Sequence, residues 1–375
     1  MTGLTSTIRK SFLGVSSLHA LGLPLLLLSN IILARLLSVE EFGVFTFIIS
    51  MLTVVAIPVS GGLPMLLTRE IAGYVANKNW GAYRAIFYRS HAWVAAMTVF
   101  FALAGSAWAF SSRDNIDLPL IVAVVLLPII GFSSVRSGIL KGLGRPGLSE
   151  IPKQLLQPAL LILGFLLLGS FGFGSVNYAL LVYLGSAVFV FLLGSAILVR
   201  VQPKGSLTTK SDASDLPRWR KSIVPFTLLA AATTISAQIG VILVGVLGTA
   251  EDVAQISVAQ RGAQLVVFPL MIMNTIIGPF FVKALLSSDR GELGAVTRHA
   301  ARLTLLLTVP LGLVLLLFGP TLLRVTFGAP YDSQAFIPMA IIIIAQLISV
   351  ALGSGGILLS MSGHERHTLY SQLLS

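Results

Sequence analysis

The chain has 375 residues, of which 55% are hydrophobic and 10% are charged, and it contains no Cys. An ordinary soluble domain carries about 25% charged residues, so the polar side chains are too few to cover a soluble globule. This composition argues against a soluble enzyme and against intrinsic disorder, and the lack of Cys excludes disulfides and thiolate chemistry. The class that remains is a polytopic helical membrane protein.

Ten segments are apolar over the roughly 20 residues that a transmembrane helix requires. Runs such as Leu160–Leu168 and Leu305–Leu317 do not alternate apolar with polar residues, as transmembrane strands would. We therefore predict an all-α polytopic membrane protein with about ten transmembrane helices. The predicted spans are 12–34, 42–66, 90–110, 118–140, 153–170, 176–199, 223–247, 253–282, 299–319 and 335–360.

The net charge of +11 follows the loops between these spans. Of the 25 Lys and Arg, 21 lie in the amino terminus, the tail after residue 361 and every second loop, counting the flanking span ends. In the opposite set of loops lie Arg113 and Arg324. Because loops rich in Lys and Arg remain in the cytoplasm, we predict that the amino terminus and the tail are cytoplasmic. The charge therefore does not indicate a nucleic-acid partner.

The longest polar segment, Val201–Lys221, separates six predicted spans from four. We predict an N-terminal six-helix lobe at 1–200, a cytoplasmic linker at 201–222 and a four-helix C-terminal lobe at 223–375. A second copy of the six-helix lobe would need two more spans than the sequence contains. We therefore expect the second lobe to be truncated.

Two short matches at one offset relate the two halves. The offset of 211 residues maps Arg9-Lys10-Ser11 onto Arg220-Lys221-Ser222, and Glu40-Glu41 onto Glu251-Asp252. In each half the acidic pair lies in the tight outer turn after the first span. Because both copies start on the same side, the predicted repeat is parallel, and parallel halves around a site near the bilayer midplane are a common transporter layout.

Arg261 is a charged residue inside a predicted span. It lies about 13 Å from the outer end of that span, and a charge at such a depth normally faces the bundle interior or an aqueous cavity. Gln260, Gln264 and Asn274 share its arc of the helix. We interpret the four side chains as a polar, cationic wall of a substrate cavity. The alternative is an arginine that extends to the interface or pairs with a helix carbonyl.

The first span carries three further candidates for the substrate path. Arg35, at its outer end, is a candidate phosphate contact, because the planar guanidinium binds phosphate oxygens in pairs. The alternative is an interfacial anchor beside Glu40 and Glu41. His19 and Asn30 are eleven residues apart and share one face, which we expect to point at other helices. A protonation role for His19 competes with that of a hydrogen-bonded structural histidine.

The 14 acidic residues all lie in loops or at span ends. Ion-coupled antiporters commonly use buried carboxylates as the proton or sodium carrier. Their absence argues against such coupling and favours an anionic substrate over a drug cation. The segment 142–147 fits G-x-G-x-x-G, but it follows a membrane span instead of a strand and does not indicate a nucleotide site. We expect no cofactor and no metal, and we do not expect an enzyme.

The segment from Ile31 to Phe45, IILARLLSVEEFGVF, resembles the first outer turn of bacterial polysaccharide flippases, in the multidrug/oligosaccharidyl-lipid/polysaccharide exporter superfamily. Short motifs in later turns add to the resemblance: Gly61-Gly62 with Thr68-Arg69, Lys141-Gly142-Leu143-Gly144-Arg145, and Phe327-Gly328 with Tyr331. The resemblance implies a V-shaped, two-lobed transporter that moves undecaprenyl-diphosphate-linked sugars to the outer leaflet by alternating access. It also implies that Arg35 and Arg261 are the positions able to hold the diphosphate or acidic sugars.

We expect a transporter of the bacterial inner membrane that serves O-antigen, capsule or exopolysaccharide synthesis. Its expected partners are the lipid-linked glycan, membrane lipids, and the polysaccharide polymerase and glycosyltransferases. Four alternatives stay open. They are a peptidoglycan-precursor flippase, a multidrug antiporter, a membrane enzyme such as a polymerase or acyltransferase, and a non-transporting component of polysaccharide assembly.

Overall fold

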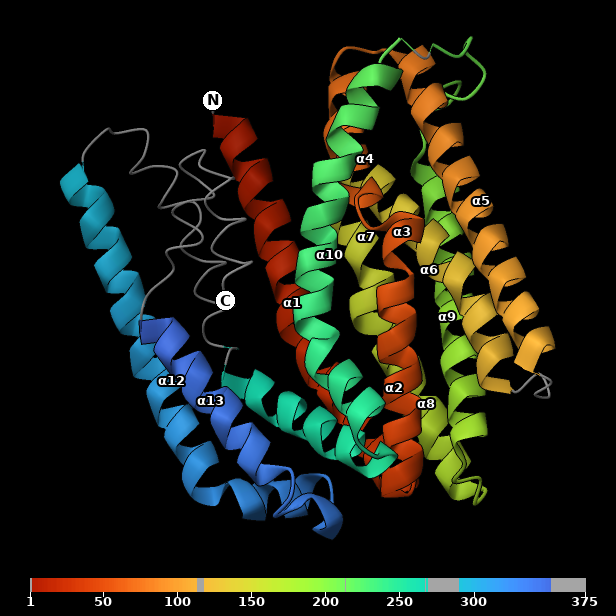
Figure 1. Cartoon of the computed structure of the whole chain (residues 1–375). Coiled ribbons are helices and arrows are strands. Elements are labelled where there is room, and N and C mark those ends of the chain that lie inside the picture. Colours follow the sequence, from red (N-terminus) through yellow and green to blue (C-terminus); the bar gives the residue numbers. More distant parts are fainter. Residues whose placement is uncertain (1, 113–117, 213, 267, 269–289, 352–375) are drawn as a thin grey trace. The chain divides into compact units, whose positions relative to one another are not determined.

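The computed structural model describes residues 2–112, 118–212, 214–266, 268 and 290–351. These residues form helices joined by short turns, without a β-strand (Figure 1), so the predicted all-α fold is confirmed. The helices are α1 (Thr2–Leu36), α2 (Val39–Val55), α3 (Ile57–Ser60), α4 (Leu63–Ala76), α5 (Trp80–Ser112), α6 (Leu118–Gly142), α7 (Pro146–Ile151), η1 (Pro152–Leu156), α8 (Gln157–Ser170), α9 (Val176–Val201), α10 (Leu216–Leu247), α12 (Arg290–Thr326), η2 (Ala329–Tyr331) and α13 (Phe336–Ala351). Residues 250–266 are also helical.

Seven stretches of helix among the described residues are long and apolar enough to cross a membrane, and the bent pair Val39–Val55 plus Ile57–Ala76 adds an eighth if it is one span. These stretches match the first seven predicted spans and the ninth. The predicted spans at 253–282 and 335–360 lie only in part within the described residues, where α13 forms a shorter apolar helix. The chain is therefore a multi-pass membrane protein.

The described helices fall into two compact units. The first comprises Met1–Leu37 and Val44–Ile242, and the second comprises Ser38–Gly43 and Leu243–Ser375. The boundary falls near the end of α10, so most of this helix belongs to the first unit, in which its Trp219 is buried. The division into lobes that the sequence predicts, at the 201–222 linker, differs from this boundary between compact units, and it stays a prediction.

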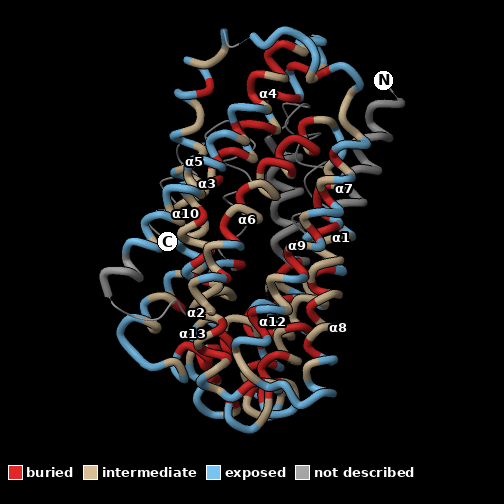
Figure 2. The backbone as a smooth tube through the Cα atoms, turned by 90° about the vertical axis from the view of Figure 1, so that its right-hand side faces the viewer, coloured by how far each residue is buried: buried red, intermediate tan, exposed pale blue. Residues whose placement is uncertain are grey.

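Helix α6 is the central element of the first unit, where it packs against α4, α5 and α9. Its first fourteen residues carry no polar side chain, and Val122, Leu126, Val135 and Ile139 of this helix are all fully buried. Figure 2 shows buried stretches along α4 and α6. A helix that is hydrophobic all round is typical of the middle of a bundle. Helix α6 therefore fixes the positions of the helices that carry the polar groups described below.

Prolines mark the irregular points of the first unit. The α2–α4 segment bends by 40° at the break before α3, and Pro58 and Pro64 lie in the first turns of α3 and α4. The η1 segment is a single π-helical turn between α7 and α8, with Pro152 at its start and Pro158 just after its end. Because proline lacks the N–H of a regular helical bond, a break or a π-turn accommodates it.

The second unit contains the same helix cap twice. At the start of α2 the Glu41 amide donates to Ser38 Oγ (3.2 Å), and the Ser38 amide donates to Glu41 Oε2 (3.5 Å). At the start of the helix at 250–266 the corresponding bonds, between Asp252 and Thr249, are 3.2 and 2.9 Å long. Each is a capping box, in which two residues satisfy each other's backbone N–H groups. The boxes are 211 residues apart, which is the offset predicted from the sequence.

The two capped helix starts also contact each other. A Cβ at Gly43 would collide with the Ala250 carbonyl, so the residue at this crossing has to be glycine. The bonds from the Thr249 amide and hydroxyl lower the pKa of the Asp252 carboxyl below its ordinary value, which keeps this cap charged. The two turns that match in the sequence at an offset of 211 residues therefore carry equivalent helix caps in the structure, and the parallel repeat of the two halves stays a prediction.

Candidate functional site

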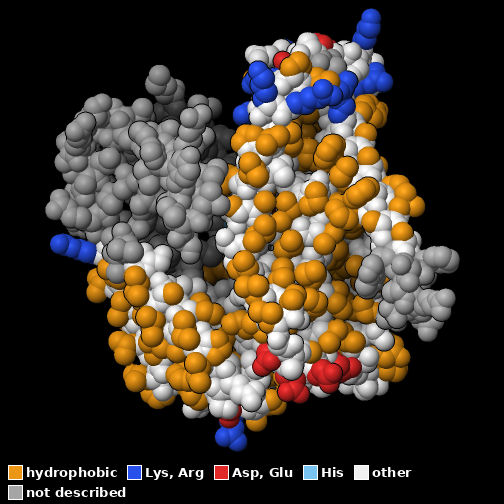
Figure 3. All heavy atoms as spheres, viewed as in Figure 1, with side chains coloured by type: hydrophobic (Ala, Val, Ile, Leu, Met, Phe, Trp, Pro, Cys, Tyr) orange, Lys and Arg blue, Asp and Glu red, His pale blue; other side chains and the backbone are white. Residues whose placement is uncertain are grey.

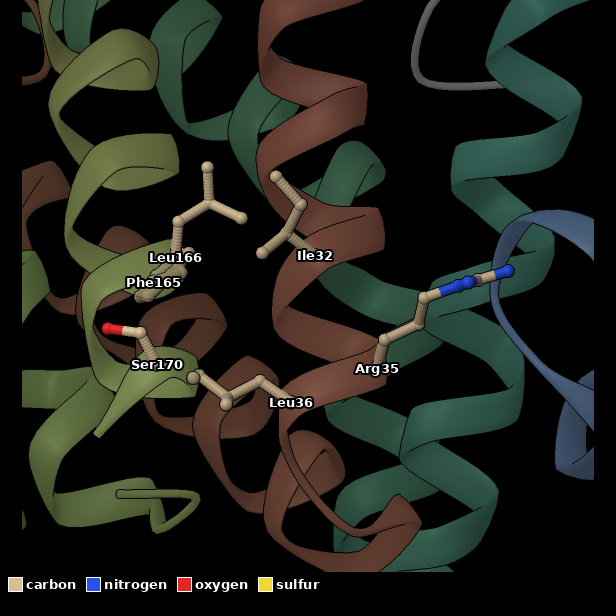
Figure 4. Close-up of a pocket in the computed structure, with 7 residues that line it drawn as sticks. Ile32, Arg35, Leu36, Phe165, Leu166 and Ser170 are labelled. Atoms are coloured by element: carbon tan, nitrogen blue, oxygen red, sulfur yellow. The ribbon is translucent and has the colours of Figure 1, made fainter. Parts of the chain in front are cut away.

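An open groove of about 500 Å³ lies between α1 and α8 in the first unit (Figure 4). It is lined by Ile32, Arg35, Leu36, Phe165, Leu166, Gly169 and Ser170. The polar members are Arg35 and Ser170, and the Ser170 hydroxyl donates to the Leu167 carbonyl within its own helix (2.8 Å). A lining of this kind suits a hydrocarbon chain, because its surface is mostly apolar.

Arg35 lies in the last turn of α1, and its side chain is exposed. A cation there is favoured by the partial negative charge of the helix C-terminus. In Figure 4 the guanidinium extends away from the other labelled side chains of the groove. The cation therefore lies beside the groove instead of over it. Its role, as a phosphate contact or an interfacial anchor, stays a prediction.

His19 and Asn30, the other candidates on α1, are both half-buried. The Asn30 amide donates to the Leu26 carbonyl of its own helix at 2.7 Å. His19 lies on α1, which packs against α7, the helix that carries Glu150. This packing tests neither of the two roles predicted for His19, so both stay predictions.

An ion pair that sequence reasoning missed joins the end of α6 to α7. Glu150 is 9% exposed and accepts a bond from Lys141 Nζ at 2.8 Å. Gln154 Nε2 donates to the second carboxylate oxygen at 3.5 Å. These three residues come from the end of α6, from α7 and from the π-turn η1. A carboxylate this deeply buried needs such partners, because desolvation costs several kcal/mol per ion.

Arg136 is a second charged group that the sequence did not single out. It lies six residues before the end of α6, about 9 Å along the helix, and it is 5% exposed. Its Nη1 donates to the Phe191 carbonyl of α9 at 2.9 Å. A Cβ at Gly194 would collide with the guanidinium, so this glycine leaves the slot that the arginine fills. Among the described residues the partner of Arg136 is thus a backbone carbonyl, and Arg136 forms no ion pair.

A third polar cluster joins α4 to the start of α10. Glu70 is 3% exposed and pairs with Arg69 at 2.7 Å and with Arg218 at 3.6 Å. Tyr74 Oη donates to Asp215 Oδ2 at 2.8 Å and accepts from Trp219 Nε1 at 2.8 Å. We name this cluster the α4–α10 network; its members are Arg69, Glu70, Tyr74, Asp215, Arg218 and Trp219.

The remaining candidates belong to the second unit. In the helix at 250–266, Gln260 and Arg261 are half-buried and Gln264 is exposed, whereas Asn274 lies outside the described residues. The cationic cavity wall stays a prediction for these four. Within the part of the chain that the structure describes, no three His, Asp or Glu side chains gather as a metal site requires.

The missed groups differ in how visible they are in the sequence. Lys141 and Glu150 lie nine residues apart across a short Gly- and Pro-containing turn, and that spacing is a usable signal for an ion pair between consecutive helices. Arg136 lies near a span end, so it was counted among the basic residues that indicate the orientation of the chain in the membrane, and nothing else in the sequence distinguishes it. Its partner on α9 is 55 residues away, and no local pattern connects the two.

The long apolar helices define a multi-pass helical membrane protein. An inward-facing multidrug resistance MATE family transporter of the MOP superfamily is similar in structure, with a TM-score of 0.64 and 18% identity over 90% of this chain and 83% of that one. MATE in complex with MaD5 is similar with a TM-score of 0.65 and 18% identity, over 97% of this chain and 86% of that one. The lipid II flippase MurJ in its inward closed conformation has a TM-score of 0.62 and 12% identity, over 88% of this chain and 71% of that one.

The chain belongs to the polysaccharide biosynthesis protein family, which it matches over residues 8–285. The family resemblance seen in the sequence is thereby confirmed. No curated protein matches the chain. Because the identities to the solved structures are all below 20%, those structures establish the fold and leave the substrate open.

Proposed function

We propose that this protein flips an anionic, polyprenyl-diphosphate-linked oligosaccharide across the bacterial inner membrane, for O-antigen, capsule or exopolysaccharide synthesis. The amino terminus is cytoplasmic in this proposal, which follows from the distribution of Lys and Arg among the loops. Arg35 and Arg261 contact the diphosphate or acidic sugars. The polysaccharide polymerase and glycosyltransferases act on the two sides of the same transport step.

The observation that carries the proposal is the family match over residues 8–285, which covers most of the chain. The chemistry of the side chains supports it. Arg35 is an exposed cation at the end of a membrane span, beside an apolar groove of about 500 Å³. A lipid diphosphate needs both a hydrocarbon surface and donors that bind phosphate oxygens, for which arginine is well suited.

A multidrug antiporter is the second candidate, and the similarity to MATE structures favours it. The buried carboxylates of the described residues weigh against it. Glu70 pairs with Arg69 and Arg218, and Glu150 pairs with Lys141. A carboxylate that is already neutralised by Lys or Arg is poorly suited to bind a cationic drug.

A peptidoglycan-precursor flippase is the third candidate, favoured by the similarity to MurJ. It shares the lipid-diphosphate chemistry of the leading proposal and differs in the glycan. The two therefore have the same arginine requirement, and a test has to follow the transported lipid itself.

The test is a deletion of the gene in its own host, followed by measurement of surface polysaccharide and of lipid-linked intermediates. The proposal predicts loss of one surface polysaccharide and accumulation of its lipid-linked precursor, both restored by the gene on a plasmid. Normal surface polysaccharide with no accumulated intermediate would overturn the proposal. Accumulation of the peptidoglycan precursor selects the third candidate instead, and increased drug sensitivity alone selects the second.

A further inference from the structure

The segment between α9 and α10 is folded onto the first unit. Arg84 Nη1 donates to the Thr209 carbonyl at 2.8 Å, and the Asp212 amide donates to the Gly81 carbonyl at 3.1 Å. Ser206, near the middle of the segment, is 1% exposed. These contacts attach the linker to the first turns of α5. The linker is therefore a structured surface of the first unit.

The acidic and the basic side chains of this surface differ in their surroundings. The carboxylates near it are engaged: Glu70 is buried among arginines, Asp215 accepts from Tyr74, and Asp212 accepts from the Ser214 amide at 2.9 Å. The cations, in contrast, point outward. We define the linker platform as the exposed basic residues Arg200, Lys204, Lys210, Arg220 and Lys221.

No ion pair among the described residues involves a member of the linker platform. Figure 3 shows Lys and Arg side chains gathered at this end of the first unit, directly beyond a band of hydrophobic side chains. The positive charge is therefore not neutralised within the unit, and it lies where the apolar, membrane-facing surface ends.

The Arg84 side chain that binds the linker also lies over an aromatic side chain of α5. Tyr88 is 52% exposed, and the Arg84 guanidinium lies 5.6 Å from the centre of its ring. An exposed tyrosine at the edge of an apolar band is typical of the headgroup region of a membrane. The platform is thus positioned to reach lipid headgroups rather than solutes far from the membrane.

We propose that the linker platform binds the headgroups of anionic phospholipids. Clusters of four to eight Lys and Arg directly beyond a membrane span are suited to anionic lipid surfaces, and each adds roughly fivefold to the affinity when it lies close to the headgroups. The contact anchors the linker at the membrane surface. The proposal does not depend on which substrate the protein transports.

The test measures lipid binding to the purified full chain in neutral detergent by native mass spectrometry, with phosphatidylglycerol and phosphatidylcholine as probes. The double variant Lys204→Gln/Lys210→Gln is expected to weaken phosphatidylglycerol binding about 25-fold and to leave phosphatidylcholine binding unchanged. The variant Lys204→Arg/Lys210→Arg retains the charge and is expected to bind as the wild type does.

The matched control is Arg145→Gln/Lys153→Gln, which removes the same charge from two exposed residues outside the linker, one just before α7 and one in η1. We expect this pair to change the affinity less than twofold, an effect well below that of one headgroup contact. The proposal would be overturned if the two Gln pairs lost the same affinity for phosphatidylglycerol, or if the Lys204→Gln/Lys210→Gln pair lost none. Displacement of phosphatidylglycerol by an equal concentration of inorganic pyrophosphate would also overturn it, because the site would then recognise phosphate without the lipid.

Discussion

Arg136 and Arg35 are two cations of the first unit in opposite surroundings. Arg136 is 5% exposed, fills a slot beside Gly194 and donates to a carbonyl of α9. Arg35 is exposed at the end of α1, beside an apolar groove. A buried charge is tolerated only where the packing satisfies it, whereas an exposed one keeps contact with its surroundings. The difference teaches that burial, rather than nearness to a span end, separates a cation that joins helices from one that a ligand can reach.

The largest effect is expected in the Arg136 slot. Gly194→Ala places a methyl group against the guanidinium, and overpacking of this kind costs about 1–3 kcal/mol in the free energy of unfolding. Arg136→Ala removes the hydrogen bond and leaves a cavity, which costs about 2–4 kcal/mol. Thermal unfolding of the purified protein measures both.

The control for the Arg136 slot is on the same helix. A Cβ at Gly185 of α9 meets no atom within 4 Å, so Gly185→Ala is expected to be neutral or slightly stabilising. The double variant Arg136→Met/Gly194→Ala is expected to be more stable than Gly194→Ala alone, because methionine adapts to a narrowed slot. An unfolding midpoint of Gly194→Ala equal to that of Gly185→Ala would show that the slot does not hold the arginine.

The α4–α10 network provides an intermediate case. Tyr74→Phe removes the acceptor of the buried Trp219 Nε1 and the donor to Asp215, and we expect a loss of about 1–3 kcal/mol in the free energy of unfolding. Tyr88→Phe removes the same hydroxyl from an exposed position, so its effect is expected to stay within about 0.5 kcal/mol. Equal effects of the two changes would mean that the network adds nothing to stability.

The smallest effect on stability is expected at Arg35. Arg35→Gln changes an exposed side chain, and such changes usually stay within about 0.5 kcal/mol. Arg136→Gln, measured beside it, is expected to be clearly destabilised. If Arg35→Gln unfolded as easily as Arg136→Gln, the contrast between the two arginines would be lost.

More of the fold than of the polar contacts could be predicted from the sequence. Apolar length located the spans, because each span is a local property of about 20 residues. The Glu40-Glu41 and Glu251-Asp252 match at one offset located two equivalent turns, because a capping box is also local. The lengths of the helices were underestimated at polar ends such as that of α4, which continues to Ala76 through the buried Glu70.

The polar contacts depend on which helices are neighbours, and a single sequence does not contain that information. Arg136 meets Phe191, and Tyr74 meets Trp219, across 55 and 145 residues. His19 and Asn30 were correctly placed on one helix, but the hydrogen bond that the Asn30 amide donates to the Leu26 carbonyl follows from rotamer choice. The candidates of the predicted cavity wall stay predictions for the same reason.

The most direct measurement is export of the lipid-linked glycan in the deletion host, complemented with Arg35→Gln, Arg35→Lys or the wild type at equal abundance in the membrane. Loss of a charge-assisted phosphate contact, about 1.5–3 kcal/mol, predicts that Arg35→Gln lowers export at least about tenfold and that Arg35→Lys recovers part of it. Wild-type export by a stably folded Arg35→Gln variant would contradict the account, because the exposed cation would then have no part in moving the substrate.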